Sequence, residues 1–154
     1  MNTKIQLGSV SSGTMRKEDL MPVFVNELLA IDPENQVASM IWAKYSEYEE
    51  DDETYWNLEE SDYDLDDLFE EFNHVCDVPY IYFGAHPGDG ADYGYWIDFD
   101  AVEDDIEYDE LLCVANEEEI PSDHVGLVAF KSKNEVVALY NSANGNFESM
   151  IWGV

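Results

Sequence analysis

Cations are scarce in this sequence. Of its 154 residues only six are Lys or Arg, against 36 Asp and Glu, so the formal net charge is −30 at pH 7. No Lys or Arg occurs in the 86 residues between Lys44 and Lys131, which carry 29 of the carboxylates. Because nucleic-acid binding depends largely on Lys and Arg that neutralise phosphates, the shortage argues against direct binding to nucleic acid. An anionic membrane surface would also repel this chain.

Residues that build common catalytic and metal sites are few as well. There are two Cys and three His, and their spacing matches no paired zinc motif. The sequence has no G-x-S-x-G elbow, and its glycine-rich stretch lacks the Lys of a phosphate-binding loop. We therefore expect no catalytic residues, no metal and no cofactor. The absence of a secretory signal and of a long apolar run predicts reduced thiols, no membrane span and a cytoplasmic location.

Apolar and aromatic residues are, by contrast, plentiful. They make up 45% and 14% of the sequence, which excludes a disordered acidic tail because such tails cannot bury enough apolar surface. The length is typical of one domain. We predict a single acidic α+β domain over residues 1–154 and leave open whether it is a monomer or a dimer.

The spacing of apolar residues predicts helices in the first half and strands in the second. We expect an edge strand over 5–10, a helix capped by Thr14 or Asp19 that ends at Asp32-Pro33, and helices over 34–48 and from Ser61 to about 75. Strands are predicted at 80–83, 93–99, 125–130, 135–140 and 147–152, with an Asn144-Gly145 turn before the last, whereas 103–110 fits either a helix or a strand. The fold class is α+β, with N-terminal helices packed on a C-terminal antiparallel sheet.

The stretch between Gly84 and Gly94 is unusual for its four glycines. We interpret these glycines as turn residues that adopt special backbone angles. A structural turn is the favoured interpretation, and an exposed contact loop is the alternative. Asp89 and Asp92 could help to hold Ca²⁺, but the stretch lacks the alternating oxygen ligands and the terminal Glu of an EF-hand loop.

The acidic residues concentrate in two runs, which we predict to form a partner-binding surface for a basic protein. The predicted residues are Glu47, Glu49, Glu50, Asp51, Asp52, Glu53, Glu59, Glu60, Asp62, Asp64, Asp66, Asp67, Glu70, Glu71, Glu103, Asp104 and Asp105. Spread evenly over a surface of about 7,900 Å², the net charge averages roughly one per 260 Å². A DNA duplex carries roughly one per 110 Å². The hypothesis therefore requires that the acids cluster on one face.

Two segments resemble a family of small, mostly uncharacterised proteins of bacteriophages and prophages: LGSVSSGTMRKEDL (residues 7–20) and YFGAHPGDGADYGYW (residues 82–96). No catalytic residues carry over from that group. In size, charge and acidic blocks laced with aromatics, the chain is also similar to phage DNA mimics, which block restriction enzymes, CRISPR effectors or other DNA-binding proteins. This resemblance implies an inhibitor that occupies the nucleic-acid-binding groove of a basic host protein. The alternatives are an acidic immunity or antitoxin-like protein that neutralises a basic toxin, and a phage structural or assembly protein.

Overall fold

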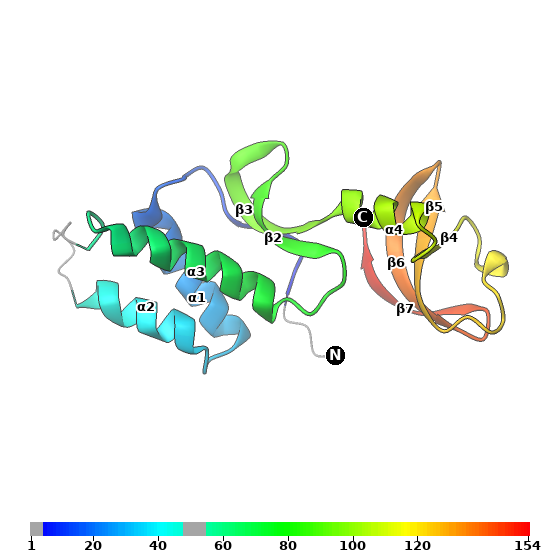
Figure 1. Cartoon of the computed structure of the whole chain (residues 1–154), viewed down its shortest axis with the longest axis horizontal. Coiled ribbons are helices and arrows are strands. Elements are labelled where there is room, and N and C mark those ends of the chain that lie inside the picture. The colour runs from blue at the N-terminus through cyan, green and yellow to red at the C-terminus, as the bar shows by residue number, and fades with distance from the viewer. Residues whose placement is uncertain (1–4, 48–54) are drawn as a thin grey trace. The chain divides into compact units, whose positions relative to one another are not determined.

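A computed structural model describes residues 5–47 and 55–154. The chain folds into two compact units: unit 1 comprises Met1–Asp77 with Ile81–Ile97, and unit 2 comprises Val78–Tyr80 with Asp98–Val154. Helices precede a C-terminal four-stranded sheet (Figure 1), which confirms the α+β class. That the two units form one domain stays a prediction.

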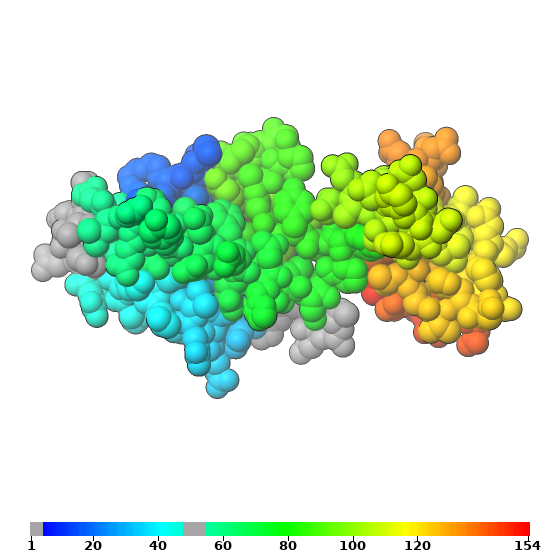
Figure 2. All heavy atoms as spheres, viewed as in Figure 1, coloured from blue at the N-terminus to red at the C-terminus, as the bar shows by residue number. Residues whose placement is uncertain are grey.

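Unit 1 combines three helices with a three-stranded antiparallel sheet. Its elements are β1 (Gly8–Ser11), α1 (Lys17–Ile31), α2 (Gln36–Ser46), α3 (Glu59–Val75), β2 (Ile81–His86) and β3 (Asp89–Ile97). The strand order is β1-β3-β2, so β1 is an edge strand, as the sequence predicts. Figure 2 shows the atoms of α3 at the surface of unit 1 that faces the viewer.

Aromatic residues fill the core of unit 1. Phe24 of α1 makes edge-to-face contacts with Phe72 of α3 and Phe83 of β2, at centroid distances of 5.5 and 5.3 Å. Phe72 stacks on Phe83 at 3.8 Å, and Tyr95 of β3 closes the cluster. Since side chains alternate along a strand, Ile81 and Phe83 of β2 and Tyr93 and Tyr95 of β3 share the face that packs in this core. This packing stabilises helix α3 independently of its acidic outer face.

The beginnings of two helices differ from the prediction. Helix α1 starts at Lys17 with Arg16 at the N-cap, so neither Thr14 nor Asp19 is the cap. Instead, the Thr14 hydroxyl donates to Asp19 Oδ2 at 2.7 Å. Helix α3 starts at Glu59, two residues before the predicted start at Ser61, because the Ser61 hydroxyl donates to the Leu58 carbonyl oxygen rather than capping an N–H group. The predicted end of α1 at Asp32 is confirmed.

Most of the Gly84–Gly94 stretch is a β-hairpin rather than a loop. Gly84 of β2 lies opposite Gly94 of β3, and neither has a positive φ, so the prediction that these glycines supply special backbone angles is wrong. Gly94 is needed for space: a Cβ there would overlap the Gly8 carbonyl group of β1, with its carbon 2.8 Å away. The glycine therefore lets β1 pair closely with β3.

Unit 2 is built on a four-stranded sheet with one helix. Its elements are α4 (Phe99–Glu107), β4 (Leu112–Val114), the 3₁₀-helix η1 (Glu117–Glu119), β5 (Gly126–Ser132), β6 (Glu135–Ala143) and β7 (Asn146–Gly153). The strand order is β4-β5-β6-β7, antiparallel except for the parallel pair β4-β5. The three late strands and the Asn144-Gly145 turn, with both φ angles positive, are confirmed. The segment 103–110, ambiguous by sequence, is helical to Glu107.

Candidate partner-binding surface

The outer face of α3 is a row of exposed carboxylates without a Lys or Arg in the helix. Leu68 and Phe72 lie four residues apart on the opposite side of the helix and are fully buried. Because residues three and four apart share a face of a helix, the acids between them gather on the outside. We define the α3 carboxylate face as Glu59, Glu60, Asp62, Asp66, Asp67 and Glu70, all exposed.

The charge per length of this face is comparable to that of one DNA strand. From Glu59 to Glu70 the helix rises over eleven residue steps, about 16.5 Å. Six carboxylates over that length have a mean spacing of ~3.3 Å, and the phosphates of a DNA strand are ~3.4 Å apart. Two members pair with lysines: Asp62 with Lys17 and Glu60 with Lys44, each at 2.9 Å. Deducting these two charges leaves four carboxylates with a mean spacing of ~5.5 Å.

Asp64 does not belong to this surface, which corrects the prediction. Its side chain is only 6% exposed, and it accepts a hydrogen bond of 2.7 Å from the Tyr55 hydroxyl. Lys44 Nζ donates to both of its carboxylate oxygens, at 3.0 and 3.1 Å. Burial, and then the bond to Asp64, raises the pKa of Tyr55 well above its usual value. Asp64 thus anchors the chain before α3 to the end of α2.

Of two further predicted residues, one has a structural partner and the other is exposed. Glu71 is half-buried and accepts a 2.7 Å hydrogen bond from the Asn35 amide, which itself caps α2 through Ala38. Glu47 is exposed at the end of α2. The five remaining acids of the first run, Glu49, Glu50, Asp51, Asp52 and Glu53, lie outside the described residues.

In unit 2 the second acidic run divides between the two sides of α4. Glu103 and Asp104 are exposed, as predicted, whereas Asp105 is half-buried and accepts a 2.6 Å hydrogen bond from Tyr80. Burial, and then this bond, raises the pKa of Tyr80 to about 12. Asp105 therefore holds the Val78–Tyr80 segment against α4. Its carboxylate is less accessible to a binding partner than that of the exposed Asp104.

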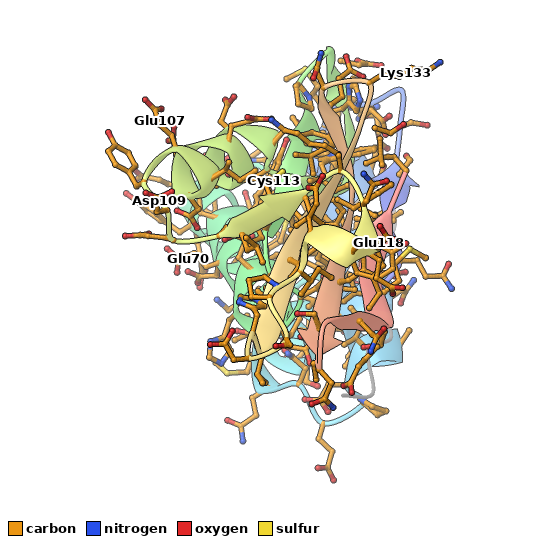
Figure 3. The ribbon with its side chains drawn as sticks, turned by 90° about the vertical axis from the view of Figure 1, so that its right-hand side faces the viewer. Glu70, Glu107, Asp109, Cys113, Glu118 and Lys133 are labelled. Atoms are coloured by element: carbon orange, nitrogen blue, oxygen red, sulfur yellow. The ribbon has the colours of Figure 1, made fainter. Side chains whose placement is uncertain are left out.

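Four exposed acids near α4 were not among the predicted residues: Asp100, Glu107, Asp109 and Glu110. Glu107 and Asp109 point outward in Figure 3. A signal for two of them was present, since Asp100, Glu103, Asp104 and Glu107 have the i, i+3, i+4, i+7 spacing of one helix face. The ambiguity between helix and strand in this segment concealed it.

Metal-ligating side chains, cysteines and apolar helices were the other candidate features of the described residues. Within residues 5–47 and 55–154, no three His, Cys, Asp or Glu side chains are grouped to hold a metal ion. The two cysteines are half-buried thiols, and burial raises the pKa of Cys113. None of the helices in the described part of the chain has the length and apolar character needed to cross a bilayer.

Comparison with known proteins gives no match: no family model, no curated protein and no solved structure is similar to this chain. Its function has to be inferred from its own surface.

Proposed function

We propose that this protein is a phage-encoded DNA mimic that inhibits a basic nucleic-acid-binding protein of the bacterial host, such as a CRISPR effector or a restriction enzyme. The α3 carboxylate face would occupy the groove in which that protein holds nucleic acid. The observation that carries the proposal is the charge spacing along this face, which equals that of a DNA strand when all six carboxylates are counted and is wider by a factor of about 1.6 when the two paired ones are left out.

Local repulsion within α3 supports the proposal. The pairs Asp62/Asp66 and Asp66/Glu70 place like charges four residues apart, which destabilises a helix by about 0.2–0.5 kcal/mol per pair. A helix selected for stability alone would place Lys or Arg at such positions. The aromatic core under α3 offsets this repulsion and keeps the row of charges in place.

The inhibition would be competitive occupancy without turnover. Carboxylates on a rigid helix take the place of phosphates, and long-range attraction accelerates the encounter with a basic groove. Such attraction falls with ionic strength, because the screening length is about 8 Å at physiological salt. Binding should therefore weaken steeply as salt is added.

The test neutralises the centre of the face with the triple variant Asp66→Asn, Asp67→Asn, Glu70→Gln. These three side chains are exposed. Partners are captured from a bacterial lysate at low salt on immobilised protein, then eluted with a salt gradient or with duplex DNA. Exposed charge pairs contribute about 0.2–1 kcal/mol each, so affinity should fall roughly tenfold for the three together.

The matched control is Glu118→Gln, Asp123→Asn, Glu148→Gln, which removes the same number of exposed charges from unit 2. It should bind as the unmodified protein does. Equal loss in both variants would mean that only net charge matters, and full retention in the α3 variant would refute the assignment of this face. A single captured protein that duplex DNA does not displace would indicate instead an immunity-type function.

A further inference from the structure

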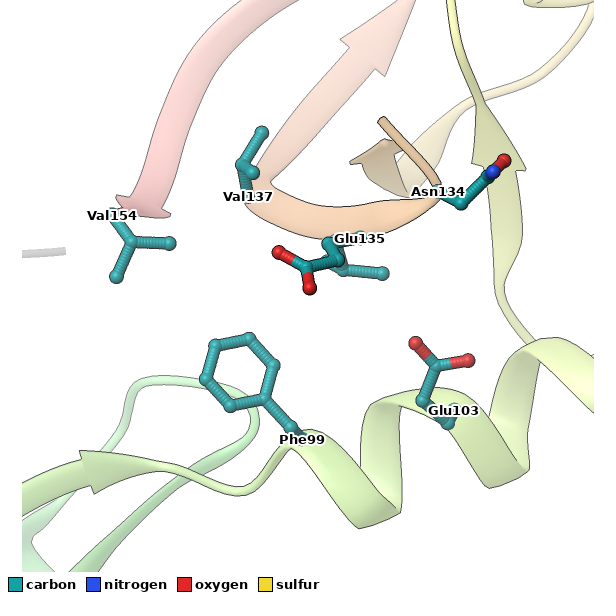
Figure 4. A pocket seen from close by; sticks show the side chains of 7 residues that line it. Phe99, Glu103, Asn134, Glu135, Val137 and Val154 are labelled. Carbon is teal, nitrogen blue, oxygen red and sulfur yellow. The ribbon is translucent and has the colours of Figure 1, made fainter. Parts of the chain in front are cut away.

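Unit 2 contains an open pocket of about 520 Å³ between α4 and the sheet. Phe99 and Glu103 of α4 line one side, and Asn134, Glu135, Val136 and Val137 of the β5-β6 hairpin line the other, with Val154 beside them. Figure 4 shows the carboxylates of Glu103 and Glu135 directed into the same space as the Phe99 ring. The volume lies within the range of about 300–1,000 Å³ typical of small-ligand sites.

Regular local structure explains why these groups converge. Phe99 and Glu103 are four residues apart and so share one face of α4. On the other side, Lys133 and Asn134 both have positive φ, 53° and 66°, which is typical of the two-residue turn that continues the twist of a hairpin. This turn fixes Glu135 at the first position of β6. Both carboxylates are thus carried by ordered elements.

The pocket has both an apolar wall and two carboxylates, and one class of ligand could contact both. Phe99 is 40% exposed and Val154 is 81% exposed, so apolar area is left open to water. Within the described part of the chain, neither the Glu103 nor the Glu135 side chain forms an ion pair or accepts a hydrogen bond, and Lys133 in the adjoining turn is not paired with them. A neutral apolar ligand would leave both charges uncompensated, whereas a bare metal ion would leave the apolar wall uncovered.

We propose that this pocket binds an organic cation with a short apolar stem, namely an alkylguanidinium or alkylammonium group. The stem would cover Phe99 and the valines, while the cationic head would lie between Glu103 and Glu135. Guanidinium suits two carboxylates because its planar donors make several charge-assisted hydrogen bonds. The same chemistry is present in a free small amine and in an Arg or Lys side chain of a protein. The inference does not rest on the function proposed for α3, which belongs to unit 1.

The test is an NMR titration of the full ¹⁵N-labelled chain with n-butylguanidinium at physiological ionic strength. Amide signals of Phe99, Glu135 and Val137 should shift together and saturate with one Kd. Because a chain of net charge −30 attracts all cations, guanidinium without a stem and n-butanol without a charge serve as control ligands. Each should shift these signals at least fivefold less at equal concentration. Shifts spread over acidic residues throughout the chain, or an equal response to either control ligand, would overturn the proposal.

A pair of variants separates the pocket from net charge. Glu103→Gln with Glu135→Gln should weaken binding by roughly five- to tenfold, since two exposed charge contacts are lost. Glu118→Gln with Glu148→Gln removes the same charge elsewhere in unit 2 and should change the Kd less than twofold. Equal weakening in both double variants would contradict binding of the cation in this pocket. A second titration with N-acetyl-arginine methylamide identifies the source: its binding indicates a protein side chain, and its exclusion beside bound butylguanidinium indicates a free small cation.

Discussion

Asp64 should behave unlike every other acid of its helix, although in sequence it is one carboxylate among many. The perturbation is Asp64→Ala, compared with Asp66→Ala two residues later on the same helix. Asp64 is buried and bonded to Tyr55 and Lys44, whereas Asp66 is exposed. The substitutions share the same change in charge and side-chain size. They differ because only Asp64→Ala removes the hydrogen-bond acceptor of a buried side chain.

The magnitude follows from the two partners. In this variant the Tyr55 hydroxyl loses its hydrogen bond to a charged acceptor, and such a bond contributes about 1.5–3 kcal/mol. Because Tyr55 is only 1% exposed, water does not readily replace the lost acceptor. The side chain of Lys44 is 34% exposed and keeps Glu60 at 2.9 Å, so its loss is discounted to about 0.5–1 kcal/mol. Asp64→Ala should therefore reduce the free energy of unfolding by roughly 2–4 kcal/mol. Asp66→Ala should change it by no more than about 0.5 kcal/mol.

Urea unfolding followed by tryptophan fluorescence measures both values. Three of the four tryptophans, Trp42, Trp56 and Trp96, lie in unit 1, so the signal mainly reports this unit. A double-mutant cycle with Tyr55→Phe should give a coupling of about 1–2 kcal/mol between Tyr55 and Asp64. If Asp64→Ala costs no more than Asp66→Ala, then Asp64 is not the anchor described above and the reasoning fails.

Two further substitutions test the hairpin of unit 1 and the Tyr80 contact of unit 2. In Gly94→Ala the added Cβ would overlap the Gly8 carbonyl group, so hydrogen exchange of the β1 amides should accelerate. The control is Gly90→Ala, which has no atom within 4 Å of the added Cβ and should leave this exchange unchanged. Equal exchange in both variants would contradict the close approach of β1 to Gly94. Since the pKa of Tyr80 is raised to about 12, from about 10 in an unfolded chain, its stabilising effect should be complete below pH ~10 and lost as the pH rises through ~12. In an absorbance titration, Tyr80→Phe should remove ionisation near pH 12, and loss of a component near pH 10 would refute this.

Strongly periodic segments were predictable from the sequence. The helices around Phe24, Ile41 and Phe72 and the three late strands repeat apolar residues at spacings that only one type of element satisfies. Boundaries were less predictable, because α1 and α3 both begin at residues whose side chains do not cap them.

The Gly84–Gly94 hairpin and the role of Asp64 were not predicted, for two different reasons. Glycine has low strand propensity, so the pattern reads as a loop unless the close approach of β1 to Gly94 is known. Asp64 is surrounded in sequence by exposed acids, and only its position four residues before Leu68 places it on the buried side. That spacing is a signal the sequence does contain, and a carboxylate on an apolar face requires a partner.

The positions of the lysines in unit 1 help to distinguish two roles of the acidic residues of α3, stabilisation of the helix and binding to a partner. In unit 1, Lys17 and Lys44 pair with Asp62 and Glu60, both in the first turn of α3, where the helix dipole already favours negative charge. Asp66, Asp67 and Glu70 follow where the dipole gives no such help, and in the described part of the chain no lysine or arginine pairs with them. Cations placed to stabilise the helix would have gone to this second half. Their absence there leaves a continuous anionic segment, which is the arrangement that binding to a basic groove requires.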